Sequence, residues 1–287
     1  MSNLEIIYRK INTETPKMGF LFYFYQKVNN MVLNLTKNNG VGTLQFNRPE
    51  KFNSFNQELA YAVQNALDDC EKDDTIRAIV ITGSGKAFCA GQDLAEATDP
   101  DGPPLKNIVG DHYNPIIKRL RKIEKPIIAA VNGVAAGAGA NIALACDLVV
   151  AKESAAFIQA FSSIGLIPDS GGTYFLPRLV GAQKALALMM TGDKVPAVEA
   201  EQMNMIYKAV ADDEFDGYIE QLANKMAKMP TRGFGLTKLA VNKSLNNDLE
   251  TQLDLEEKLQ AEAGSTEDFK EGTQAFLEKR KPTFKGK

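Results

Sequence analysis

Residues 126–147 read PIIAAVNGVAAGAGANIALACD, and this stretch decides the fold class of the chain. The apolar run 126–131 predicts a buried strand, and residues 132–137 predict a tight turn of small side chains. Residues 138–145 then predict a helix, and residues 148–151 predict a further strand. Strands that alternate with helices in this way are typical of an α/β protein.

The same alternation begins nearer the N-terminus. Residues 32–35 and 41–46 predict two strands around a short turn, and the β-branched run 76–81 predicts a buried strand. Ser54 and Gln57 have the spacing of a capping box, which predicts the start of an amphipathic helix between the second and third strands. The predicted fold class is therefore α/β.

The chain divides into three predicted parts. Residues 1–30 are an extension that we expect to be poorly ordered, since the regular pattern of an ordered domain begins only after Met31. Its apolar run 19–25 is far shorter than the roughly 20 residues of a membrane-spanning helix. No small-residue cleavage site of a signal peptide follows that run. Residues 31–212 carry the strands and form the predicted α/β core, whereas the pattern of residues 213–287 predicts a helical C-terminal module.

Charge and composition argue against several classes of function. Of 287 residues, 36 are Asp or Glu and 33 are Lys or Arg, so the net charge of −3 gives no support for a nucleic-acid partner. We expect no membrane partner either. Cys70, Cys89 and Cys146 are far apart and His112 is the only histidine, so neither a disulfide framework nor a metal site is expected. Such cysteines favour a reducing compartment, and we expect a cytoplasmic protein.

Two glycine-rich turns invite a nucleotide-binding interpretation that neither fits. Residues 83–86 lack the spacing of a phosphate-binding loop, and residues 133–139 do not match the dinucleotide fingerprint. Both turns join a predicted buried strand to a helix start, where free N–H groups carry partial positive charge. Two such turns at neighbouring strand ends could aim two N–H groups at one oxygen, as an oxyanion hole does. Alternatively the small residues only permit close packing, and spacing alone leaves both interpretations open.

Four motifs give the sequence a resemblance to one superfamily. They are NRP and NSFN within 47–56, AFCAGQDL at 87–94, the stretch 126–147, and GLIPDSGGT at 165–173. In this order they resemble the signature of the crotonase, or enoyl-CoA hydratase/isomerase, superfamily, and the resemblance covers residues 31–287. It implies a spiral of ββα units with a helical C-terminal module, a homotrimer or dimer of trimers, and an acyl-CoA substrate with no further cofactor.

The resemblance also implies the residues of the site. The backbone N–H groups of Gln92 and Ala138 match the oxyanion hole that holds the thioester oxygen. Phe276 and Lys279 match a place where a neighbouring subunit closes the coenzyme site. Lys51 matches a phosphate contact, and a solvated surface lysine is the alternative. The positions expected to contact substrate are Lys51, Phe52, Ser54, Ala90, Gln92, Asp93, Leu94, Ala138, Phe161, Pro168, Thr173, Phe276 and Lys279.

The same resemblance separates isomerisation from hydration. Hydratases of the superfamily position water with two glutamates, and at the matching positions this chain has Asn141 and Phe161. Neither side chain can act as a general base, so we expect no water addition by that route. Asp169 matches a carboxylate that either shuttles a proton between carbons or attacks an aromatic ring, and a helix N-cap is the alternative. Phe161, Ile164 and Leu166 could line the site and raise the pKa of Asp169.

Within the superfamily the sequence is most similar to the isomerases of bacterial phenylacetate degradation, which turn ring-1,2-epoxyphenylacetyl-CoA into oxepin-CoA. The segments TQLDLE at 251–256 and PTFKGK at 282–287 contribute to that similarity. The implied mechanism has Asp169 remove and return a proton α to the thioester while Gln92 and Ala138 hold the thioenolate. Open alternatives are a Δ3,Δ2-enoyl-CoA isomerase, a dehalogenase or thioesterase with Asp169 as nucleophile, and a non-catalytic relative that binds acyl-CoA or RNA.

Overall fold

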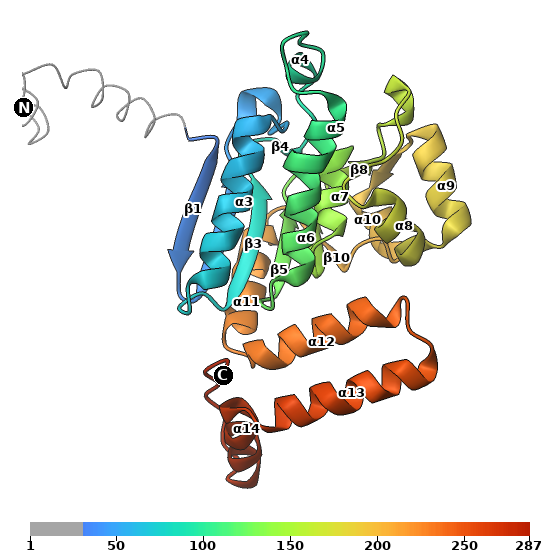
Figure 1. Cartoon of the computed structure of the whole chain (residues 1–287). Helices are drawn as coiled ribbons and strands as arrows, with labels where there is room; N and C mark the ends of the chain where they lie inside the picture. Colours follow the sequence, from blue (N-terminus) through green and yellow to red (C-terminus); the bar gives the residue numbers. More distant parts are fainter. Residues whose placement is uncertain (1–30) are drawn as a thin grey trace, which may run out of the picture. The chain divides into compact units, whose positions relative to one another are not determined.

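From β3 to β8, successive strands alternate between two sheets in the computed structural model, which describes residues 31–287 (Figure 1). The first sheet holds, side by side, β1 (Leu33–Asn38), β2 (Val41–Phe46), β3 (Ala78–Gly83), β5 (Ile127–Val131), β7 (Leu148–Lys152) and β10 (Lys208–Val210). The second sheet holds β4 (Ala87–Cys89), β6 (Val134–Ala136), β8 (Ala156–Ile158) and β9 (Lys194–Pro196). The expectation that residues 1–30 are poorly ordered lies outside the described residues.

The order of the strands makes the chain a spiral. β3, β5 and β7 are neighbours in the first sheet, and the strands that follow them, β4, β6 and β8, are neighbours in the second. A helix completes each pair: α4 (Leu94–Ala97), α7 (Ala138–Leu144) and α8 (Gly172–Val180). The ββα unit thus occurs three times, and the predicted α/β spiral is confirmed. The other helices are η1 (Pro49–Lys51), α3 (Gln57–Lys72), α5 (Leu105–Asn107), η2 (Ile108–Tyr113), α6 (Asn114–Lys122), η3 (Ser162–Ile164), α9 (Ala182–Thr191), α10 (Ala197–Gln202), α11 (Phe215–Ala227), α12 (Thr231–Ser244), α13 (Leu249–Gly264) and α14 (Glu267–Leu277).

Helices cover both faces of the first sheet. α3 packs on one face with α6 beside it, and α11 covers the other face (Figure 1). β5 is buried along its whole length, as expected for a strand of a parallel sheet that is covered on both sides. On the α11 side, Phe215 and Ala223 pack with the strand residues Val80, Ile128 and Val150 in one apolar cluster. Burial of this cluster fixes the position of the strand ends from which the loops project.

Three local predictions are wrong, and all concern short features. Residues 83–86 were expected to join a strand to a helix, but they join β3 to β4. Residues 132–137 were expected to form only a turn, but they contain β6, which pairs with β4 and β8. The capping residue of α3 is Asn56 and not Ser54, because the Asn56 side chain accepts the N–H of Leu59 (3.0 Å). Ser54 is instead buried in the loop before the helix.

The helices predicted after residue 212 are present as α11 to α14. α11 belongs to the packing of the first sheet, whereas α12, α13 and α14 lie below it in Figure 1. The last residues fold back onto α14, where the Asp268 carboxylate accepts the backbone N–H groups of Lys285 (2.6 Å) and Gly286 (2.7 Å). A domain boundary at residue 212 stays a prediction. Within residues 31–287, no helix has the length and apolar character needed to cross a membrane.

Candidate active site

The turns that follow β4 and β6 meet at the edge of the second sheet. A Cβ on Gly91 would lie 3.0 Å from the carbonyl oxygen of Ala136 and 3.6 Å from the backbone nitrogen of Ala138. Gly91 and Gly137 have φ values of 93° and 53°, in the region that glycine adopts most readily. The absence of side chains at Gly91 and Gly137 therefore lets the backbone just before Gln92 lie close to the first residue of α7.

Two backbone N–H groups in these turns have no acceptor. Phe55 donates its N–H to the carbonyl of Gly91 (2.7 Å) and accepts the N–H of Asp93 (2.8 Å). Gln92 lies between Gly91 and Asp93, and its N–H takes no part in these two hydrogen bonds. Ala138 is the first residue of α7, where an N–H has no acceptor within the helix. In the described part of the chain, no hydrogen bond engages either group. Free donors on adjacent turns can stabilise an oxyanion.

Asp169 lies in the loop between η3 and α8, and its surroundings favour the protonated form of its carboxyl group. Burial raises the pKa of Asp169, and the hydrogen bond donated by the Ser170 hydroxyl (2.8 Å) opposes that rise. A carboxylate whose pKa is raised toward the working pH is better suited to act as a general base. The predicted apolar lining is only partly present in one chain, because Phe161 is 6% exposed but Ile164 and Leu166 are 53% and 38% exposed.

Two buried amides connect α7 to the backbone of Asp169. Asn141, in the first turn of α7, donates its Nδ2–H to the carbonyl oxygen of Asp169 (2.9 Å). Gln159 in turn donates its Nε2–H to Oδ1 of Asn141 (2.8 Å), and both side chains are buried. The ring of Phe161 lies 3.8 Å from the place of a Cβ on Gly137. These contacts place Asp169 beside the turn that begins α7, and neither Asn141 nor Phe161 adds a carboxylate to it.

Tyr113 links the Gln92 turn to the same region. Its hydroxyl donates to Oε1 of Gln92 (2.7 Å), and Nε2 of Gln92 donates to Oε2 of Glu96 (3.0 Å), so both ends of the amide are held. Burial raises the pKa of Tyr113 well above its usual value, and nearby negative charges, that of Asp169 among them, add to the rise. Neither Tyr113 nor Gln159 was among the site residues predicted from the sequence.

The residues expected to contact coenzyme A are mostly exposed around the Gln92 turn. Ala90 donates its N–H to the carbonyl of Phe52 (3.0 Å), which joins the loop after β2 to this turn. The side chains of Lys51, Phe52 and Leu94 are exposed, with Phe52 at 57% and Leu94 at 53%. Of the remaining predicted contacts, Thr173 is exposed, Pro168 half-buried and Ser54 buried.

Asp93 holds the turn together and does not present a free carboxylate. Arg48 donates to Oδ2 of Asp93 (2.8 Å) and to the carbonyl of Ser54 (2.5 Å). Burial alone would raise the pKa of Asp93, but the hydrogen bonds from Arg48 and from the N–H of Ala95 outweigh it and lower the pKa. The carboxylate is therefore engaged within the protein, although it was expected to contact substrate.

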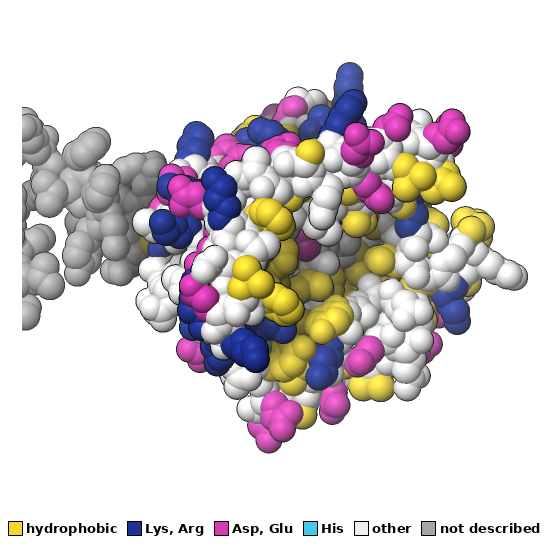
Figure 2. Space-filling view, turned by 90° about the horizontal axis from the view of Figure 1, so that it is seen from below, with side chains coloured by type: hydrophobic (Ala, Val, Ile, Leu, Met, Phe, Trp, Pro, Cys, Tyr) yellow, Lys and Arg dark blue, Asp and Glu magenta, His cyan; other side chains and the backbone are white. Residues whose placement is uncertain are grey.

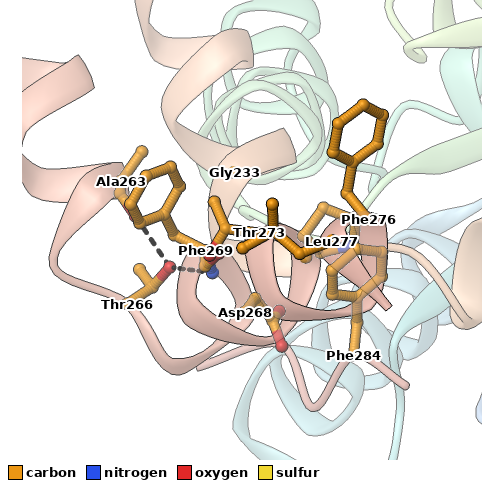
Figure 3. A pocket seen from close by; sticks show the side chains of 11 residues that line it. Gly233, Ala263, Thr266, Asp268, Phe269, Thr273, Phe276, Leu277 and Phe284 are labelled. Carbon is orange, nitrogen blue, oxygen red and sulfur yellow. Dashed lines mark hydrogen bonds between the residues drawn. The ribbon is translucent and has the colours of Figure 1, made fainter. Parts of the chain in front are cut away.

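Phe276 and Lys279 lie apart from these residues, at the end of α14 and just after it. Phe276 lines an open cavity of about 630 Å³ between α12, α13 and α14. Figure 3 shows Phe269 and Phe284 around the same cavity, and none of its lining residues surrounds Asp169. One chain therefore does not bring Phe276 and Lys279 to the two turns, and their contact with a neighbouring subunit's site stays a prediction.

The helices α12 to α14 present an apolar surface. Figure 2 views this side of the molecule from below and shows hydrophobic side chains gathered around a hollow. A gathering of exposed apolar side chains is typical of contact with another chain or with a ligand. The large hydrophobic side chains exposed on these three helices, or directly after α12 in the case of Leu245, are Leu239, Val241, Leu245, Leu249, Leu253, Phe269, Phe276 and Leu277.

Known proteins resemble the chain in both sequence and structure. Residues 36–287 match the family described as enoyl-CoA hydratase/isomerase. The chain is 49% identical over 251 residues to 1,2-epoxyphenylacetyl-CoA isomerase of Escherichia coli K12, a match that covers 86% of this chain and 96% of the relative. It is 36% identical to trans-2-decenoyl-[acyl-carrier-protein] isomerase of Streptococcus mutans, over 87% of this chain and 96% of the relative. The crystal structure of an enoyl-CoA hydratase from Bacillus anthracis matches with a TM-score of 0.83 at 32% identity, covering 89% of this chain and 100% of that one.

The ββα spiral and these matches define the class of protein as a crotonase-fold enzyme. The chain belongs to the enoyl-CoA hydratase/isomerase family. The predicted superfamily is confirmed, and so is the predicted class, an enzyme of CoA-thioester chemistry.

Proposed function

We propose that the chain is an isomerase that transfers a proton within an acyl-CoA thioester, with Asp169 as the base. The observation that carries the proposal is the position of Asp169. Its pKa is raised by burial, and Asn141 joins its backbone to the helix whose first N–H, that of Ala138, is free. Asn141 and Phe161 lack the carboxylates that a hydratase of this superfamily uses at these positions, so isomerisation is the better supported reaction.

In the proposed reaction Asp169 accepts the proton from the carbon α to the thioester, and the C–H electron pair forms the thioenolate. The thioester oxygen becomes negative and accepts hydrogen bonds from the N–H groups of Gln92 and Ala138. Asp169 then returns its proton to the rearranged acyl group, so no proton or electron is gained or lost over the cycle. One oxyanion donor typically contributes about 2.7–4 kcal/mol, which is roughly a hundred- to a thousandfold in rate.

For the substrate we propose ring-1,2-epoxyphenylacetyl-CoA, which the enzyme would convert to oxepin-CoA. The 49% identity to a relative named 1,2-epoxyphenylacetyl-CoA isomerase supports this choice. A 3-enoyl-CoA whose double bond moves to position 2 is the second candidate, favoured by the relative named trans-2-decenoyl-[acyl-carrier-protein] isomerase. The test is a side-by-side assay of the purified chain on both thioesters, and failure to isomerise either would contradict the proposed reaction.

A covalent role is the main alternative for Asp169. A dehalogenase of the same fold would form an aryl ester with this carboxylate as halide leaves, and a thioesterase would form a mixed acyl anhydride as the coenzyme A thiolate leaves. Acid quenching during turnover, followed by mass spectrometry of the peptide that carries Asp169, distinguishes the two roles, because the proposed isomerase forms no adduct. A chain that binds phenylacetyl-CoA but converts none of these thioesters would instead be a non-catalytic binding relative.

We further propose how the coenzyme and the subunits are arranged. The exposed side chains of Lys51, Phe52 and Leu94 would contact coenzyme A beside the Gln92 turn. Phe276 and Lys279 would close the site of a neighbouring subunit in a homotrimer or dimer of trimers, and the apolar surface of α12 to α14 supports such an assembly. Three free cysteines, all buried, support a cytoplasmic location. Analytical ultracentrifugation measures the assembly, and a monomer at micromolar concentration would contradict it.

A further inference from the structure

The turn that carries Asp169 is held in a conformation that its sequence disfavours. Ser170, the next residue, has a φ of 50°, in the left-handed region that residues with a side chain seldom adopt. It is only 1% exposed, and its hydroxyl donates to the Asp169 carboxylate. Such a backbone conformation persists only where surrounding groups hold it. The groups that hold this turn therefore decide where the Asp169 carboxylate points.

Two donors hold the carbonyl oxygen of Asp169. One is the backbone N–H of Gly172 (2.8 Å) and the other is Nδ2–H of Asn141 (2.9 Å). A Cβ on Gly172 would lie 2.4 Å from Nδ2 of Asn141, which is too close for any real contact. Glycine at position 172 therefore leaves the space through which the Asn141 amide reaches the turn.

Gln159 fixes the direction of the Asn141 amide. Its Nε2–H donates to Oδ1 of Asn141 (2.8 Å), so the Nδ2 donor of Asn141 has to face Asp169. Gln159 is 2% exposed, and its Oε1 is buried without a hydrogen-bond partner among the described residues. A buried acceptor without a hydrogen-bond partner lowers stability, so the hydrogen bonds of the Gln159 side chain are incomplete. The hydrogen bond that its amide does form serves Asn141.

We infer that Asn141 and Gln159 are positioning residues for Asp169, and we call the pair the amide clamp. The inference rests on the proposed function, because it assigns to the clamp the placement of the proposed base. The clamp runs from the end of β8 through α7 to the loop before α8. α7 also begins with the free N–H of Ala138. The base and one proposed oxyanion donor therefore share a single buried support.

Loosening the clamp should lower kcat more than it changes KM. A misplacement of about 1 Å at a reacting group can cost roughly a hundredfold in rate. The exposed residues proposed to bind the coenzyme, Lys51, Phe52 and Leu94, lie in or next to η1 and α4, whereas the clamp residues lie in α7 and after β8. A residue with a merely structural role would lower the amount of folded protein and leave the kcat of the folded fraction unchanged.

Two substitutions loosen the clamp by different routes. Gln159→Met keeps the length of the side chain and removes the donor to Asn141, whereas Gly172→Ala keeps every polar group and displaces the Asn141 amide. We expect each to lower kcat at least about tenfold, with KM changed by less than about threefold. The matched control is Gly217→Ala, another helical glycine, where an added Cβ meets no atom within 4 Å. It should leave kcat and KM unchanged.

Asp169→Asn is measured alongside, so that failure of the clamp and failure of the proposed function can be told apart. If Asp169→Asn is inactive while the clamp variants keep kcat within about twofold of wild type, Asn141 and Gln159 do not position Asp169, but Asp169 is still the base. If Asp169→Asn turns over like wild type, the proposed function itself is wrong. Circular dichroism shows which variants are folded at the assay temperature. If only one of the two clamp variants is folded, its kcat is sufficient to test the inference. An equal loss in kcat for Gly217→Ala would also overturn the inference.

Discussion

Proline at position 138 would remove one proposed oxyanion donor and place a ring methylene where that N–H points. Ala138 is the first residue of α7, which is the helix position that accepts proline best, because its N–H has no acceptor within the helix. Gly137, before it, has no Cβ to clash with the proline ring. Ala138→Pro should therefore keep α7 intact while it deletes a single N–H from the edge of the second sheet.

The expected loss follows from the usual contribution of one oxyanion donor. Removing it should raise the barrier by about 2.7–4 kcal/mol, a fall in kcat/KM of roughly a hundred- to a thousandfold. Steady-state kinetics on the better of the two candidate thioesters measures this loss. Infrared difference spectra of bound phenylacetyl-CoA give an independent measurement, because two donors polarise the thioester carbonyl and lower its stretching frequency. The variant should lose part of that shift.

Ala182→Pro is the matched control for this experiment. Ala182 is the first residue of α9, follows Gly181 as Ala138 follows Gly137, and is exposed. It should keep kcat/KM within about twofold of wild type, since proline is tolerated at this helix position. If folded Ala138→Pro kept more than about a third of wild-type kcat/KM, the Ala138 N–H would not be an oxyanion donor, since losing a donor costs far more than that.

Three further predictions concern residues around the site and the tail. Tyr113→Phe deletes the hydrogen bond to Gln92, so it should lower the free energy of unfolding in urea by about 1 kcal/mol and lower kcat roughly tenfold. An unchanged kcat would show that the Gln92 turn does not need this hydrogen bond. Ser170→Ala removes the hydrogen bond that lowers the pKa of Asp169, so the pH at which activity is lost on acidification should rise. An unchanged acid limb of the pH–rate profile would refute this role of the Ser170 hydroxyl. Asp268→Ala leaves two N–H groups of the tail unpaired and should lower the free energy of unfolding by about 1–3 kcal/mol, and a melting temperature equal to wild type would contradict the anchoring of the tail.

Elements with a clear period could be predicted from the sequence, and the shortest ones could not. Residues 43–46 alternate between polar and apolar side chains, and β2 buries Gly42, Leu44 and Phe46. The apolar run 126–131 contains the fully buried β5. β4, β6 and β8 have three residues each, which is too few to display a period. The second sheet therefore left no pattern, and the spiral followed only from the resemblance to a family.

The same limit applies to the candidate site. Of the two predicted glycine turns, only residues 133–139 include a turn of the candidate site, because residues 83–86 join β3 to β4 and the Gln92 turn follows β4. The approach of the Gln92 turn to the start of α7 follows from the parallel pairing of β4 with β6. Tyr113 and Gln159 could not be found in this way. A tyrosine in a π-helical turn and a glutamine after an apolar triplet look like ordinary core or loop residues, and their partners Gln92 and Asn141 are 21 and 18 residues away. Only tertiary packing brings these pairs together.

Exchange of the α proton tests the central claim, that Asp169 is the base, most directly. Phenylacetyl-CoA carries that proton but has no ring epoxide to rearrange, so deuterium uptake from D2O, followed by NMR, reports proton abstraction alone. Wild-type enzyme should exchange the proton, and Asp169→Asn should slow exchange by at least about a hundredfold while its affinity for phenylacetyl-CoA and its melting temperature stay near wild type. Exchange by Asp169→Asn at close to the wild-type rate would contradict the account.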